Sequence, residues 1–465
     1  MSHLALIATI LLVHGAGAVE PSPIAKDRLP IEVRARQVKD MRYGMFICWS
    51  FSSFSGTEWT DPAGKDASFF AATGCDTDQW VRTAKDAGMK YILFLTKHHD
   101  GFCLWDTATT DQKVTKSPLG LDVLKQLRGS CDKYGIKLAL YFSEGDWTFP
   151  GTKGPKVTHG SGKAPDLVRA QLQELCTNYG PIEFFWLDCA GGHAGLKHEE
   201  INAWIKKFQP NCLVGANGGS PANGFELRAG EIARPIPVTD FPVGEFCFTL
   251  LPSHAGGANW FYSLPKHDQL CRKPEDVYGA WQLAVKSDLI FSLDVGPDYQ
   301  GKLRDIDVKT LTQVGEWIHD PAKGPAPLPP ALSSGKPATA SSVDQGYHAR
   351  RWTPDAVVDD NISFVSYWNA DHEARNAWIE IDLLREESVG RVELYERINP
   401  TIQQFVIEYQ VGDGWLQAAT GTTVGAKHVI DFPPVKARKI RLTVVKSSGS
   451  IRLEEFRVLP PAVAP

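Results

Sequence analysis

Ile182-Glu183-Phe184-Phe185-Trp186-Leu187-Asp188 is a short apolar run that ends on an acidic residue. Such a run is typical of a strand that is buried on both faces of a parallel sheet. Burying an ionised carboxylate at the end of this strand is costly unless the group is partnered or used. We therefore expect Asp188 either to perform chemistry or to cap the loop that follows it.

Similar apolar runs recur along the first two thirds of the chain and alternate with segments of helical periodicity. The further predicted strands are Tyr43–Trp49, Lys90–Thr96, Lys137–Phe142, Cys212–Ala216 and Leu289–Val295. The predicted helices are Asp78–Ala87, Leu121–Tyr134, Asp166–Tyr179, Lys197–Phe208, Pro274–Lys286 and Asp305–Ile318. Strand–helix alternation over about 250 residues predicts an α/β fold with a (β/α)8-like barrel. Because Gly218–Ser263 is rich in Gly and Pro, we predict long loops there and a distorted barrel.

A proline-rich segment, Pro321 to Pro330, marks a change of pattern. It cannot continue a helix or a strand, so we assign residues 321–332 as a linker after a catalytic domain of residues 19–320. Beyond it, short segments alternate apolar and polar residues: Ala377–Asp382, Ser388–Tyr395, Gln404–Tyr409, Lys439–Val445 and Ile451–Val458. This alternation predicts an antiparallel β-sandwich over residues 333–465.

The N-terminal residues 1–18 form an apolar run that ends on Ala16-Gly17-Ala18. This pattern predicts a cleaved signal peptide and a secreted protein, extracellular or periplasmic, with no membrane span in the mature chain. The net charge of -5 does not favour nucleic-acid binding. Nine cysteines at wide intervals, all before residue 272, indicate neither a disulfide framework nor a zinc site, although export permits one or two bridges.

Reactive residues follow several predicted strands. Lys97-His98-His99-Asp100-Gly101-Phe102 follows the second, Ser143-Glu144-Gly145-Asp146-Trp147 the third, and the first leads towards Glu58-Trp59. Catalytic groups of a parallel barrel gather at the carboxyl ends of its strands. Adjacent residues leaving a strand point in opposite directions, so we expect His98 and His99 to hold no metal. One should bind a substrate hydroxyl and the other should have a buried structural role. We expect no cofactor.

These motifs carry a resemblance to a known family. The matching stretches are Arg42–Trp49, Gly56–Trp59, Lys97–Phe102, Tyr141–Trp147, Phe185–Asp188, Asp294–Asp298 and Gly315–Ile318. Together they resemble the barrel of glycoside hydrolase family 29, the α-L-fucosidases. The resemblance implies that Asp188 is the nucleophile and that Glu58, Trp59, His98 and His99 contact the sugar. It also places Tyr141 and Trp147 in the same pocket.

Two departures from the family pattern affect the expected site. Cys48 stands where the family usually has His, so this substrate-binding position loses one hydroxyl contact. Ala216-Asn217-Gly218-Gly219 replaces the family's Asn-Asp-Arg, so an Arg contact is missing or comes from elsewhere, for example from Arg228.

The second catalytic carboxylate is not marked by a motif. Glu231 follows Asp188 by 231 − 188 = 43 positions, the spacing nearest to the family's usual placement, and is our candidate for the acid/base. Glu245 and Glu226 are the alternatives.

The C-terminal segment resembles a discoidin-like (coagulation factor 5/8 type C) module. The resemblance rests on Gly335–Ser342, Ala356–Asp359, Trp378–Asp382 and Ala437–Arg441. These are framework positions, so the module either binds carbohydrate or is purely structural. Its candidate sugar-binding aromatics are Tyr347, His348, Trp352 and Trp368.

By resemblance, the chain is a retaining exo-α-L-fucosidase acting on fucosylated oligosaccharides or polysaccharides through a covalent glycosyl-enzyme. Trp59 and Phe102 are candidates to contact the C6 methyl group of fucose. Two alternatives stay open: a retaining hydrolase of a related sugar, such as a sulfated fucoside or an α-galactoside, and a catalytically inactive carbohydrate-binding protein.

Overall fold

The computed structural model describes residues 23–148, 164–189, 195–231, 234–254, 257–262, 264–345 and 352–462. The predicted signal peptide lies outside these ranges. Within them, no helix has the length and apolar character needed to cross a membrane. All nine cysteines are among the described residues, and each is a free thiol.

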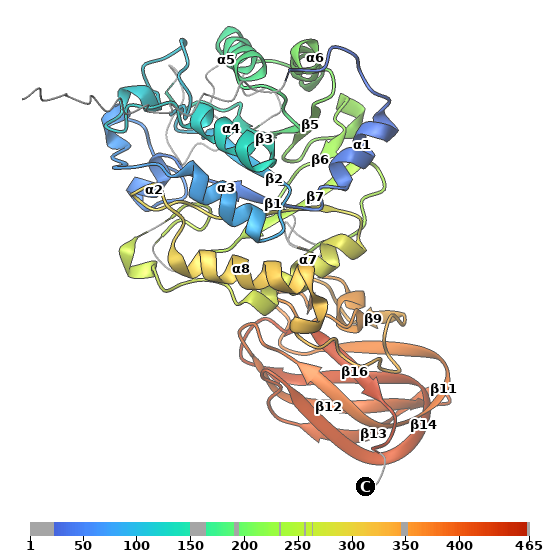
Figure 1. Ribbon diagram of the computed structural model, residues 1–465. Coiled ribbons are helices and arrows are strands. Elements are labelled where there is room, and N and C mark those ends of the chain that lie inside the picture. The colour runs from blue at the N-terminus through green and yellow to red at the C-terminus, as the bar shows by residue number, and fades with distance from the viewer. Residues whose placement is uncertain are drawn as a thin grey trace, which may run out of the picture.

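The N-terminal part is a closed parallel barrel whose strands follow one another in chain order (Figure 1). Its strands are β1 (Tyr43–Ile47), β2 (Tyr91–Lys97), β3 (Lys137–Ser143), β4 (Phe184–Asp188), β5 (Leu213–Ala216), β6 (Leu227–Arg228), β7 (Val243–Thr249) and β8 (Ile290–Asp294). Gly44 of β1 pairs with Tyr91 of β2 on one side and with Ser292 of β8 on the other, which closes the barrel. The predicted (β/α)8-like barrel is therefore confirmed.

Helices surround this barrel (Figure 1). They are α1 (Ile31–Lys39), α2 (Phe51–Ser55), α3 (Thr77–Asp86), α4 (Val123–Tyr134), α5 (Pro165–Asn178), α6 (His198–Phe208), α7 (Pro274–Lys286) and α8 (Asp305–His319). Two of them begin with an Asp cap: the Asp76 side chain accepts from the backbone N–H of Gln79 in α3, and the Asp122 side chain accepts from that of Lys125 in α4. Each strand thus returns through a helix or a loop that leaves its carboxyl end at one face of the barrel.

The prediction of long loops over Gly218–Ser263 is wrong in part, because β6 and β7 lie inside this segment. Strand β6 has two residues, too few to show a pattern. Strand β7 is wholly buried, but Gly244 and Glu245 interrupt its apolar run. Gly244 is required because a side chain there would meet Val238 and Leu289 within 3 Å. The barrel is closed; its irregular places include the two-residue β6 and a register shift between Leu95 and Lys97 in the pairing of β2 with β3.

Strands β5 and β6 join through a very close backbone approach. Their one register pair is Gly215 with Leu227. A Cβ atom at Gly215 would lie 2.4 Å from the carbonyl oxygen of Leu227, closer than any real contact. Only glycine therefore permits this pairing.

The C-terminal part is antiparallel, as predicted. Its strands are β9 (Ala338–Ala340), β10 (Trp368–Asn369), β11 (Ala377–Tyr395), β12 (Ile402–Val411), β13 (Gly414–Gly421), β14 (His428–Ser447), β15 (Arg452–Leu453) and β16 (Glu455–Leu459). The main sheet has the order β13-β12-β14-β11-β16, with β9 also paired to β11, and β10 pairs with β15. The predicted strands Ala377–Asp382 and Ser388–Tyr395 form one long strand, β11, with a register shift between Asp382 and Glu387.

The proline-rich segment after α8 begins with one short helical turn. Residues 321–323 form a short 3-10 helix, η5 (Pro321–Lys323), because proline is tolerated in a first helical turn.

The candidate sugar-binding aromatics of the C-terminal module have different positions. Trp368 is fully buried and its indole N–H donates to the carbonyl of Ser342, so it cannot stack on a sugar. Trp352 stacks on Tyr367 at 4.2 Å between ring centroids. Tyr347 and His348 lie outside the described residues.

The Gly215–Leu227 approach predicts the effect of adding one methyl group. Gly215→Ala should destabilise the protein by about 1–3 kcal/mol, because the strands would have to separate. Gly129→Ala is the matched control: Gly129 lies in α4 with open space around it, so the same change should be neutral or stabilising. Thermal or urea unfolding of both variants tests this, and equal stabilities would contradict it.

Candidate active site

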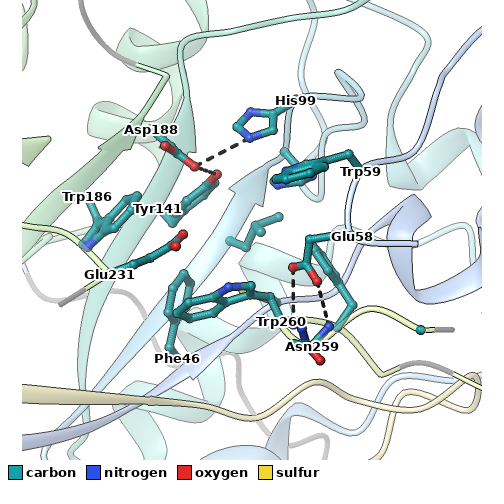
Figure 2. Close-up of a pocket in the computed structure, with 15 residues that line it drawn as sticks. Phe46, Glu58, Trp59, His99, Tyr141, Trp186, Asp188, Glu231, Asn259 and Trp260 are labelled. Carbon is teal, nitrogen blue, oxygen red and sulfur yellow. Dashed lines mark hydrogen bonds and ion pairs between the residues drawn. The ribbon is translucent and has the colours of Figure 1, made fainter. Parts of the chain in front are cut away.

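A pocket opens at the carboxyl ends of the barrel strands (Figure 2). Its volume is about 410 Å³, enough for one sugar ring and part of a neighbour. Its lining residues are Phe46, Cys48, Glu58, Trp59, Leu95, His98, His99, Tyr141, Trp186, Asp188, Glu231, Gly257, Asn259, Trp260 and Phe261. The structure thus brings together residues from segments far apart in the chain.

Asp188 is the last residue of β4, and three donors orient its carboxylate. The Tyr141 hydroxyl donates to Oδ2 at 2.7 Å, the backbone N–H of Cys189 donates to Oδ1 at 2.8 Å, and the Asn217 amide donates to Oδ1 at 3.3 Å. Cys189 has a positive φ of 47°, so the chain turns sharply directly after the strand. The carboxylate is fixed, and 16% of the side chain stays exposed to the pocket.

His98 and His99 both line the pocket, so the expectation that they point in opposite directions is wrong. Their ring centroids lie 4.1 Å apart. Strand β2 ends at Lys97, and the alternation of a strand does not extend into the turn that follows.

The two imidazoles have different partners. Nε2 of His99 lies 3.6 Å from Oδ2 of Asp188, and its Nδ1 lies 2.7 Å from the Ser143 hydroxyl. Nδ1 of His98 is buried without a partner among the residues that the structure describes, and burial lowers the pKa of His98 well below its usual value. A neutral His98 is suited to exchange a hydrogen bond with a ligand hydroxyl. Among the described residues, no group of three or more His, Cys, Asp or Glu side chains is arranged to hold a metal ion.

Glu58 lies across the pocket from Asp188 (Figure 2). Its carboxylate accepts the backbone N–H of Asn259 at 2.7 Å and that of Trp260 at 3.4 Å. Burial raises the pKa of Glu58, and the two N–H donors oppose this shift. These bonds tie the segment after β1 to the loop after β7, and so hold Trp260 at the pocket.

The floor of the pocket is aromatic. The rings of Tyr141 and Trp186 stack at 5.2 Å between centroids, and Phe46 lies 5.8 Å from Tyr141 and 5.8 Å from Trp260. Trp59 is 49% exposed at the rim. Aromatic faces bind the C–H surface of a sugar, while the polar walls bind its hydroxyls.

The three candidates for the second carboxylate occupy different places. Figure 2 shows the carboxyl group of Glu231 pointing into the pocket, on the side of Asp188 and Trp186. Glu245 is fully buried inside the barrel, where it accepts the Trp186 indole N–H at 2.6 Å and the Ser292 hydroxyl. Glu226 precedes β6 and pairs with Arg28 at 3.2 Å and Lys206 at 2.5 Å. Of the three, only Glu231 lines the described pocket.

Four other candidates have mixed positions. Cys48 lines the pocket, and burial, followed by the charge of Asp294, raises the pKa of its thiol. Trp147 packs against His99 at 5.3 Å but does not line the pocket. Arg228 lies 4.0 Å from Asp240 and does not supply the expected Arg contact in the pocket. Phe102 is buried against Phe51, so it cannot contact a substrate methyl group.

Some pocket residues escaped the sequence analysis. Phe46 and Trp186 lie two positions before Cys48 and Asp188, so the alternation of a strand could have placed them on the same side. Asn259, Trp260 and Phe261 come from the loop after β7, and no local pattern marks them.

Acidic groups that line an aromatic pocket at the carboxyl ends of a parallel barrel are the arrangement expected of a glycoside hydrolase. The family model "Alpha-L-fucosidase" matches residues 25–323, and the model "F5/8 type C domain" matches residues 337–456. The chain therefore belongs to the α-L-fucosidase family and carries a discoidin-like module.

Named relatives have similar sequences, and a solved structure shares the fold. A putative α-L-fucosidase 1 of Oryza sativa subsp. japonica is 26% identical over 94% of this chain and 86% of its own length. α-L-Fucosidase 1 of Arabidopsis thaliana is 26% identical over 87% and 82%. A fucosidase of Ruminococcus gnavus, solved in complex with fucose, shares the fold with a TM-score of 0.50 at 21% identity, over 97% of this chain and 98% of that one.

Glu144, directly after β3, is buried close to this pocket. Within the described part of the chain, neither oxygen of its carboxyl group has a hydrogen-bond partner, and its backbone N–H donates to the carbonyl of Asp188 at 2.9 Å. Burial raises the pKa of Glu144 to about 8; Lys97 opposes the shift and the charge of Asp188 adds to it. Glu144 is therefore neutral over most of the physiological range.

This raised pKa predicts a pH-dependent stability. Between the ordinary Glu pKa near 4.5 and about 8, the unfolded chain loses its proton while the folded chain keeps it, so stability falls as pH rises. Glu144→Gln should remove this loss, which amounts to ~1.4 kcal/mol per pH unit at most. The melting temperature of the variant, relative to the unmodified protein, should rise from pH 5 to pH 8. Glu386→Gln, at an exposed carboxyl, should show no such trend; parallel curves for Glu144→Gln would contradict the assignment.

Proposed function

We propose that this protein is a retaining exo-α-L-fucosidase, which removes terminal α-L-fucosyl residues from oligosaccharides or polysaccharides. The observation that carries the proposal is that Asp188 and Glu231 face one sugar-sized pocket from neighbouring sides. The names of the relatives and the fucose-bound structure of Ruminococcus gnavus support fucose as the sugar. We also propose that the chain is exported, because of its N-terminal segment.

In the proposed reaction, an oxygen of Asp188 attacks the anomeric carbon and forms a covalent glycosyl-enzyme. Glu231 protonates the departing glycosidic oxygen, then removes a proton from the water that releases fucose. The bonds from Tyr141, Cys189 and Asn217 hold Asp188 in place for attack. Such positioning supplies much of the rate enhancement of an enclosed site.

The remaining lining residues would select the sugar. Neutral His98, together with His99 and Glu58, offers hydrogen bonds to ring hydroxyls from two walls of the pocket. Trp59 and Trp260 present apolar surface, which suits the C6 methyl group of fucose and disfavours the hydroxymethyl group of galactose. A pocket without a described Arg gives no specific place for a sulfate group.

The nucleophile assignment predicts a large and rescuable loss of activity. Asp188→Ala should lower kcat on 4-nitrophenyl α-L-fucoside by roughly a thousandfold or more, because no covalent intermediate can form. Azide should restore turnover and produce the β-fucosyl azide, since it attacks from the side that Asp188 vacates. The unmodified protein should turn over this substrate in preference to 4-nitrophenyl α-galactoside and sulfated fucosides. Binding of fucosides without turnover would contradict the proposal.

The acid/base assignment predicts a dependence on the leaving group. Glu231→Ala should lose little activity on 4-nitrophenyl α-L-fucoside and roughly a hundredfold or more on a fucosyl disaccharide, whose leaving oxygen needs a proton. Azide should yield the α-fucosyl azide with this variant, because Asp188 is intact.

The matched control is Glu226→Gln, at a carboxylate that pairs with Arg28 and Lys206 and does not line the pocket; it should change both substrates by a similar factor. If Glu245→Gln shows the leaving-group dependence instead, the assignment of Glu231 is wrong.

A further inference from the structure

The backbone next to Glu231 is held by the interior of the barrel. The N–H of Gly230 hydrogen-bonds to the buried carboxylate of Glu245. The carbonyl of Gly230 accepts from the thiol of Cys247 at 3.5 Å. Both partners lie on β7, so the chain is anchored to the strand that follows it before it reaches Glu231.

Three residues after Glu231 in the sequence, the side chain of Arg234 contacts the C-terminal module. Its guanidinium donates from Nη1 to the Thr353 hydroxyl at 3.1 Å and to Asp355 at 3.0 Å, and from Nη2 to Asp359 at 3.2 Å. Arg234 is only 5% exposed. A buried guanidinium with two carboxylate partners is a strong, directional contact.

The acidic side of this contact is itself rigid. Asp355 lies in the 3-10 helix η7 (Pro354–Val358), which packs against β9, β10 and β16. Asp359 also accepts the Ser366 hydroxyl and the backbone N–H of Asn361. The amide of Asn361 in turn donates to the carbonyl of Gly279 in α7 at 3.0 Å, which ties the module back to the barrel.

We propose that the discoidin-like module positions the acid/base through Arg234. The proposal rests on the function proposed above. Glu231 lies on the connection between Gly230, which bonds to β7, and Arg234, which bonds to the C-terminal module. Its carboxyl group must meet the glycosidic oxygen within hydrogen-bond reach, and an error of about 1 Å in such a position can cost ~10²-fold in rate. The module is thus part of the catalytic apparatus, and Arg234 is a positioning residue.

The test compares two contacts between module and barrel. Arg397 of the module donates to Asp276 of α7 at 2.9 Å, away from the connection that carries Glu231. Arg234→Ala removes two ion pairs and Arg397→Ala removes one, but only the first variant touches the connection that carries Glu231. Rates on 4-nitrophenyl α-L-fucoside and on a fucosyl disaccharide are measured for the full-length chain and both variants.

Arg234→Ala should lower kcat on the disaccharide by roughly tenfold or more while changing the 4-nitrophenyl substrate by less than threefold, as in a partial loss of the acid/base. The alkaline limb of its pH–rate profile should also move. Arg397→Ala should keep the ratio of the two rates, and Arg234→Lys should restore it in part. Should Arg234→Ala not fold, Asp355→Asn, at a mostly exposed partner, gives the same comparison.

An unchanged ratio in Arg234→Ala, or the same change in Arg397→Ala, would overturn the proposal. Failure of the underlying function looks different: the unmodified protein would turn over no fucoside, or Glu231→Ala would show no leaving-group dependence.

Discussion

The buried carboxylate of Glu245 joins the interior of the barrel to both sides of the pocket. It accepts the indole N–H of Trp186, the hydroxyl of Ser292 and the backbone N–H of Gly230. Burial raises its pKa to about 7, and these three donors oppose the shift. Trp186 lies two residues before Asp188 and Gly230 lies one before Glu231, so one hydrogen-bonded group constrains the approach to both carboxylates. A buried polar group of this kind is costly unless all its bonds are made, which makes the arrangement specific.

The two proposed catalytic carboxylates are held by different means. Asp188 is part of a barrel strand, and its oxygens accept bonds from β3, from its own turn and from Asn217. Glu231 follows a strand of two residues, so the barrel alone offers little to fix it. The contacts of Gly230 and Arg234 provide the support that a longer β6 would give, and the contact of Arg234 is with the C-terminal module. This difference explains why a barrel enzyme would benefit from a second domain that does not line its pocket.

Local sequence patterns were sufficient to predict the two domains and most strands of the barrel. Runs such as Phe184–Asp188 are buried on both faces, so hydrophobicity alone marks them, and the change of period after the proline-rich segment marks the second domain. Strand β7 was not predicted because Gly244 and Glu245, which serve long-range contacts, break its apolar run. The close approach of the His98 and His99 rings was not predicted because side chains in a turn follow no fixed period.

The amino-acid sequence by itself determined the barrel, the antiparallel module and the strand-end position of Asp188, since each depends on neighbours along the chain. Only the tertiary structure decided which glutamate lines the same pocket as Asp188, because Glu226, Glu231 and Glu245 lie within twenty residues of one another and differ in where the backbone directs them. It also decided that Trp260 lines the pocket and that the Arg234 side chain bonds to the second domain. Those outcomes depend on groups far apart in sequence, whose mutual distances no local pattern encodes.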